Sequence, residues 1–63
     1  MRITEFWRLM ETRFGSAYAR SLAMDYRVPG LGSTVDEALA AGVDTKEIWR
    51  AVCVEFEVPR EFQ

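Results

Sequence analysis

Residues that end helices divide this chain of 63 amino acids into short segments, and this punctuation constrains the fold most. Gly15 offers a left-handed stop, Gly42 ends a later segment, and neither Pro29 nor Pro59 can continue a helix. The apolar residues between these points recur at helical spacing, with no sustained alternation of period two. The sequence therefore predicts an all-α fold, a compact bundle of three to four short helices in one domain, residues 1–63.

Capping residues indicate where the first two helices begin. Thr4 is the predicted N-cap of the first helix, which runs to Gly15, and Ser16 is the predicted N-cap of the second. The second helix is expected to end near Val28, because Pro29 disfavours helical geometry in the residue before it.

The second half of the chain contains two further helix starts. Thr34 and Glu37 have the spacing of a capping box, in which a hydroxyl and a carboxylate satisfy backbone donors reciprocally. This helix is short and ends at Gly42. Asp44 is the predicted cap of the last helix, which Pro59 closes.

A chain of this length buries only about 60% of the surface that its unfolded form exposes, so nearly every large apolar side chain is needed in the core. Cys53 lies on the same helical face as Val52 and Phe56, which predicts a small core side chain with an unreactive thiol. The side chains expected to form most of one core are Phe6, Trp7, Met10, Phe14, Tyr18, Leu22, Leu39, Ile48, Trp49, Val52 and Phe56.

Composition indicates a folded protein of the cytoplasm. The chain is 49% hydrophobic and 29% charged, which is too apolar for a disordered tail and too interrupted by charge for a membrane span. A single cysteine cannot form an intrachain disulfide, and it favours a reducing compartment. Residues 1–14 carry glutamates within their apolar periodicity, unlike a secretory signal.

The side chains that carry most enzymatic chemistry are missing. Histidine is absent and cysteine occurs once, which removes most nucleophilic constellations and the common zinc sites. Most carboxylates fall in first helical turns, where they complement the helix dipole. We expect no catalytic residue, no cofactor and no metal, and therefore no enzyme.

Residues 38–52 have the sequence ALAAGVDTKEIWRAV, whose spacing resembles that of a helix-turn-helix. In that motif a small residue is followed by a glycine at the turn and by apolar residues that face inward. The second helix of this pair begins with Asp44 and includes Glu47, and residues 31–63 hold only three basic residues against seven acidic ones. DNA readers instead present basic or amide side chains to bases and phosphates. DNA binding, with Lys46 and Arg50 as the contacts, is therefore the alternative interpretation.

The leading interpretation is a small, non-enzymatic protein-interaction or regulatory module. Leu9, Met24 and Val54 fall outside the apolar faces of their helices at 100° per residue, so they are predicted to be exposed in a docking patch. Isolated apolar surface residues are also normal, and a bundle can bury a second side of some helices. A basic rim favouring an acidic partner is expected from Arg8, Arg13, Arg20 and Arg27.

Several separated blocks carry a family resemblance: MRITEFW at the start, FGSAYA at Phe14–Ala19, EALAAGVD at Glu37–Asp44, WRAVC at Trp49–Cys53 and VP at Val58–Pro59. Together they resemble a family of short actinobacterial proteins known as domain of unknown function three-thousand-forty-six. The resemblance covers nearly the whole chain and is weakest in the loop at residues 28–33.

The resemblance implies a bacterial, cytoplasmic, stand-alone protein without an assigned activity. Similar proteins are often encoded beside the recombinase and its regulator, which implies an association with DNA recombination or repair. The expected partner is another protein, with nucleic acid as the alternative and neither a membrane nor a metal involved.

Overall fold

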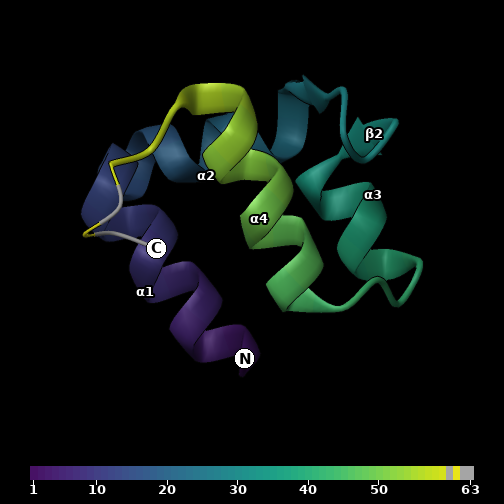
Figure 1. The fold of residues 1–63 in the computed structure, drawn as a ribbon, viewed down its shortest axis with the longest axis horizontal. Coiled ribbons are helices and arrows are strands. Elements are labelled where there is room, and N and C mark those ends of the chain that lie inside the picture. The colour runs from purple at the N-terminus through teal and green to yellow at the C-terminus, as the bar shows by residue number, and fades with distance from the viewer. Residues whose placement is uncertain (60, 62–63) are drawn as a thin grey trace.

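The structure, a computed structural model, describes residues 1–59 and 61. Within these residues the chain is mostly helical and also contains a small antiparallel sheet of two strands, so the prediction of a purely α-helical fold is wrong in that detail. In chain order the elements are α1 (Ile3–Phe14), α2 (Ser16–Asp25), β1 (Arg27–Val28), β2 (Ser33–Thr34), α3 (Val35–Ala40) and α4 (Thr45–Phe56) (Figure 1).

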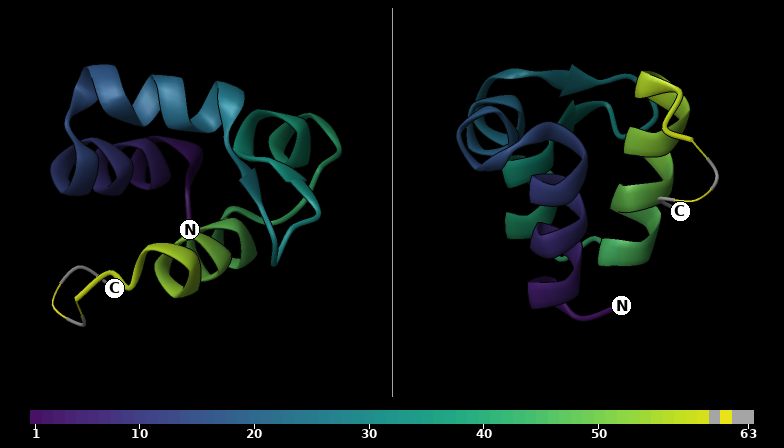
Figure 2. Two further views of the ribbon diagram at one scale, coloured as in Figure 1. Left: turned by 90° about the horizontal axis from the view of Figure 1, so that it is seen from above. Right: turned by 90° about the vertical axis from the view of Figure 1, so that its left-hand side faces the viewer.

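Helices α1 and α4 run side by side in the same direction. At their beginnings, the Thr45 hydroxyl donates a hydrogen bond to the Met1 carbonyl at 2.6 Å. At their ends, the rings of Phe14 and Phe56 meet edge to face, with centroids 5.4 Å apart. Helix α2 packs against α1, α3 packs against α2 and α4, and β1 contacts α4 (Figures 1 and 2). The termini of α1, α2 and α4 thus converge at one end of the molecule.

The core lies between these helices and agrees with most of the prediction. Phe6 is fully buried at its centre, where its ring meets that of Trp49 edge to face. The predicted core side chains that are buried are Phe6, Met10, Leu22, Ile48, Trp49 and Val52. Those that are partly buried against this core are Trp7, Phe14, Leu39 and Phe56.

Tyr18 is the predicted core residue that the structure places outside, since 55% of its surface is exposed. The inward face of α2 consists instead of Ala19, Leu22 and Ala23. Two alanines on that face let α2 approach its neighbours closely, which leaves no room there for a tyrosine ring. The Tyr18 ring packs edge-on against Phe14 at 5.9 Å.

Both helix starts predicted in the second half are confirmed. The Thr34 hydroxyl accepts a hydrogen bond from the Glu37 amide at 3.1 Å, and the Glu37 carboxylate accepts one from the Thr34 amide at 3.0 Å, a complete capping box. The Asp44 carboxylate accepts a hydrogen bond from the Lys46 amide at 2.9 Å. These caps fix where α3 and α4 begin.

The two caps predicted in the first half are wrong. Helix α1 begins at Ile3, so Thr4 lies inside its first turn, and its N-cap position holds Arg2 without a side-chain hydrogen bond. Helix α2 begins at Ser16 itself, and Gly15, with φ of 86°, occupies the junction. A glycine with positive φ reverses the chain within one residue, which leaves no separate position for a serine cap.

The segment that follows α2 turns back as a short hairpin. Helix α2 ends at Asp25, earlier than the predicted end near Val28, and β1 pairs with β2 in the register Arg27 to Thr34 and Val28 to Ser33. The predicted loop forms the tip of this hairpin. The absence of a sheet was therefore a wrong prediction, because two-residue strands are too short to show an alternating pattern.

A tight turn joins α3 to α4, as the sequence predicts. Gly42 has φ of 85°, its amide donates to the Leu39 carbonyl at 3.1 Å, and the Val43 amide donates to the Ala38 carbonyl at 3.0 Å. These two bonds make a Schellman motif, in which a left-handed glycine satisfies the last carbonyls of a helix. Helix α4 ends at Phe56 with left-handed Glu57, before the predicted stop at Pro59.

Candidate functional site

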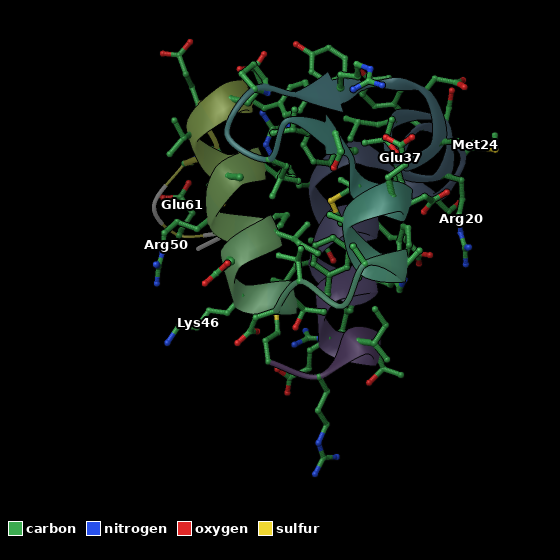
Figure 3. The ribbon with its side chains drawn as sticks, turned by 90° about the vertical axis from the view of Figure 1, so that its right-hand side faces the viewer. Arg20, Met24, Glu37, Lys46, Arg50 and Glu61 are labelled. Carbon is green, nitrogen blue, oxygen red and sulfur yellow. The ribbon has the colours of Figure 1, made fainter. Side chains whose placement is uncertain are left out.

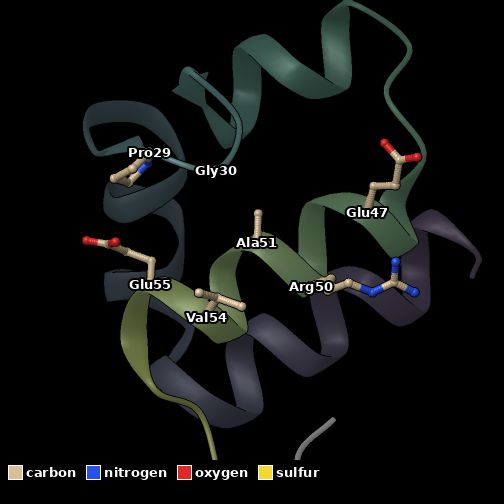
Figure 4. A pocket seen from close by; sticks show the side chains of 7 residues that line it. All are labelled: Pro29, Gly30, Glu47, Arg50, Ala51, Val54 and Glu55. Atoms are coloured by element: carbon tan, nitrogen blue, oxygen red, sulfur yellow. The ribbon is translucent and has the colours of Figure 1, made fainter.

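A shallow groove of about 390 Å³ runs along the outer face of α4, beneath the tip of the hairpin (Figure 4). The loop supplies one wall and successive turns of α4 supply the other. The lining residues are Pro29, Gly30, Glu47, Arg50, Ala51, Val54 and Glu55. The groove is open along its length and suits an extended or helical segment better than an enclosed small molecule.

The floor of the groove is apolar because the loop lies directly on α4. A Cβ added to Gly30 would stand 3.3 Å from the Ala51 Cβ, closer than ordinary contacts, so the glycine permits this approach. Val54 lines the groove beside Ala51 and is 76% exposed. Gly30 lies in the loop at residues 28–33, and its nearness to Ala51 has no local sequence signal.

Charged side chains stand at both ends of the groove. Glu47 and Arg50 lie toward the beginning of α4, and Glu55 lies toward its end (Figure 4). The Tyr26 hydroxyl donates a hydrogen bond to the Glu55 carboxylate. This hydrogen bond is the main cause that raises the pKa of Tyr26 above its ordinary value of 10.0, with partial burial and the charge of Glu55 adding to it.

The three apolar residues predicted to be exposed do not share one face. Val54 and Met24 are exposed, Met24 by 62%, whereas Leu9 is half-buried and packs against the core, so its predicted exposure is wrong. Met24 lies beside Arg20, on the opposite side of the view from Arg50 (Figure 3). The arrangement of α1 against its neighbours buries the side of that helix on which Leu9 lies.

The predicted basic rim does not surround the groove. Arg20 lies over the Trp7 ring at 4.7 Å, and Arg27 donates a hydrogen bond to the Gly32 carbonyl at 3.3 Å. No lining position of the groove, within the part of the chain that is described, is held by Arg8, Arg13, Arg20 or Arg27. The acidic and basic groups beside Val54 instead come from α4 itself.

The two residues proposed for nucleic-acid contact lie close together. Lys46 and Arg50 are both exposed one helical turn apart on α4 (Figure 3). Both line a hollow of about 160 Å³. Trp49 also lines this hollow, although its ring is almost completely buried, as predicted.

Cys53 is buried in the core, and burial raises the pKa of its thiol above 9.0. A thiol in such surroundings is poorly reactive, which agrees with its predicted role as a core side chain. Among residues 1–59 and 61, no three acidic, cysteine or histidine side chains gather where they could hold a metal ion. The helices of these same residues are too short or too polar to cross a membrane.

The protein is thus a small, mostly helical domain with an open surface groove that has charged side chains at both ends. The family model described as protein of unknown function DUF3046 matches residues 1–61, and the chain therefore belongs to this family. This confirms the resemblance drawn from the sequence blocks. Comparison with curated proteins and with solved structures gives no match.

Proposed function

We propose that the protein is a non-enzymatic protein-interaction or regulatory module, and that the groove along α4 holds a segment of its partner. The observation that carries this proposal is the exposure of Val54, 76% of whose surface is open in a groove that Ala51 and Pro29 also line. An exposed aliphatic side chain in an apolar groove gains free energy when a partner covers it.

Charge around the groove favours a basic partner segment. Two carboxylates, those of Glu47 and Glu55, stand against the single guanidinium of Arg50. The acidic partner suggested by the sequence depended on an arginine rim that lies elsewhere in the fold. Complementary charge steers association and fixes register, so the partner segment combines apolar residues for the floor with lysine or arginine for the edges.

Affinity capture from the native cytoplasm tests this proposal, with Val54→Glu as the key variant and Met24→Glu as its matched control. Both side chains are exposed, so both variants keep the parent's helical circular dichroism. We expect Val54→Glu to lose the partner and Met24→Glu to retain it, with nuclease treatment making no difference. Capture by the parent should weaken as salt rises.

Equal capture by the parent and Val54→Glu would overturn the groove as the docking site. Loss of the captured protein on nuclease treatment would instead favour the second candidate function. An association with DNA recombination or repair, which the family resemblance implies, belongs to the first proposal.

The second candidate function is DNA binding through α3 and α4 as a helix-turn-helix. It is favoured by the exposure of Lys46 and Arg50 one turn apart near the beginning of α4. Binding through phosphates must fall steeply with salt. Micromolar or tighter binding to a labelled duplex, with a strong salt slope that disappears in a Lys46→Ala and Arg50→Ala double variant, would establish this function in place of the first.

A further inference from the structure

A second, smaller cleft of about 180 Å³ lies along α2, from its first turn to the residue that follows it, and it is lined by Tyr18, Ser21, Leu22, Asp25 and Tyr26. Leu22 is buried and forms its floor, whereas the two tyrosines are 55% and 39% exposed. Binding sites for drug-sized molecules usually start at about 300 Å³. A cleft of this size accommodates one side chain rather than a nucleotide or a cofactor.

Neighbouring rings hold the two tyrosines in place. The Tyr18 ring packs edge-on against Phe14 at 5.9 Å, and the Tyr26 ring packs against Phe56 at 5.0 Å. Phe14 and Phe56 are themselves in contact, so the four rings form a continuous aromatic cluster. Aromatic rings attract cations over their faces, most strongly where water is partly excluded.

The electrostatic surroundings of the cleft also favour a cation. Asp25 is the last residue of α2, where backbone carbonyls leave partial negative charge and where cations are the stabilising side chains. No basic residue occupies the last turn of this helix as the structure describes it. Arg13, whose guanidinium lies over the Phe14 ring at 5.3 Å, does not line the cleft.

We propose that this cleft binds a single basic side chain, arginine or lysine, from the partner segment that occupies the groove. This inference deepens the proposed function and rests on it, because Tyr26 lines the cleft, Glu55 lines the groove, and a hydrogen bond joins them. The cation fits between the tyrosines and pairs with Asp25.

The hydrogen bond to Glu55 supports this role of Tyr26. A phenol that donates to a carboxylate is more electron-rich, and its ring attracts a cation more strongly. The same bond raises the pKa of Tyr26 above its ordinary value.

The experiment is a titration of the isotopically labelled protein with the peptide acetyl-Leu-Arg-Leu-amide, followed by nuclear magnetic resonance. Its matched control is the same peptide with citrulline, which has the shape of arginine without the charge. We expect saturable shifts at Tyr18, Ser21 and Tyr26, and binding of the citrulline peptide about fivefold weaker or more, as expected for a cation–π contact and an ion pair together.

Two variants locate the effect. Asp25→Asn should bind the arginine peptide at least about threefold more weakly than the parent does, because one exposed ion pair is lost. Asp36→Asn, which removes an exposed carboxylate from the first turn of α3, should bind like the parent. Both aspartates are exposed, and unchanged circular dichroism checks that the variants are folded.

Equal binding of the arginine and citrulline peptides, or equal binding by the parent and Asp25→Asn, would overturn the proposal. Tetramethylammonium that binds as tightly as the peptide would overturn the assignment to a partner's side chain. The peptide titration needs no natural partner, so its failure is distinguishable from a failure of Val54→Glu to abolish capture.

Discussion

The hydroxyl of Tyr26 donates a hydrogen bond to the carboxylate of Glu55, which joins the residue after α2 to the last turn of α4. The two residues are far apart in the chain, and the bond forms because the fold brings Tyr26 against the last turn of α4, where its ring also packs against Phe56. It places an acceptor at the boundary between the groove and the tyrosine cleft. One partner segment could therefore contact both surfaces.

Replacing Glu55 by Gln should lower the pKa of Tyr26 toward its ordinary value, because the hydrogen bond to a carboxylate is the largest cause of the shift. A raised folded-state pKa contributes stability that is present below the unfolded value of about 10 and is lost as pH rises through the folded value. Resonance titration of the Tyr26 ring measures the first effect. Thermal unfolding above pH 10, with Tyr26→Phe as the comparison, measures the second.

Parent protein should lose more stability than Tyr26→Phe over that alkaline range. An unchanged pKa of Tyr26 in Glu55→Gln would show that the hydrogen bond is not formed in solution.

The sequence predicted most of the helical fold, and the caps of α3 and α4 were predictable because their evidence is local. Thr34 and Glu37 are three residues apart, and their hydrogen bonds depend on that spacing alone. The hairpin could not be found in this way, since its two strands hold two residues each and form only when the chain turns at residues 29–32.

The candidate site was less predictable than the fold. Val54 was identified because helical periodicity places it opposite the core face. The groove also requires Gly30 to lie against Ala51, and its connection to the cleft requires Tyr26 to reach Glu55. Both relationships depend on tertiary packing. Tyr18 was assigned to the core by its size, although the two alanines on the inward face of α2 decide the packing.

Thr34→Ala should destabilise the protein by about 1 kcal/mol, as is typical when an N-cap hydroxyl is removed. The matched control is Thr4→Ala, because Thr4 lies inside the first turn of α1 and makes no capping bond. Its free energy of unfolding should stay within about 0.5 kcal/mol of the parent. Chemical denaturation measures both values, and equal losses would contradict the helix start at Ile3.

Trp49→Ala should reduce the free energy of unfolding by about 3–5 kcal/mol, a large share of the stability of a domain this small. Trp49 is only 3% exposed and packs edge-on against Phe6. Its indole nitrogen has no hydrogen-bond partner among the described residues, so the loss comes from packing rather than from a broken polar contact. A variant as stable as the parent would mean that the indole faces solvent.

Leu9→Glu and Val54→Glu should differ in stability although both replace an aliphatic residue by a charge. Leu9 packs against the core, so a carboxylate there loses apolar contact and must remain near water, at a cost of about 2 kcal/mol. Val54 is 76% exposed, and its substitution should change the free energy of unfolding by no more than about 0.5 kcal/mol. Thermal and chemical unfolding of the two variants, each compared with the parent, measure the difference. A stable Leu9→Glu would restore Leu9 as a surface residue, whereas an unfolded Val54→Glu would place Val54 in the core and remove the apolar floor on which the groove depends.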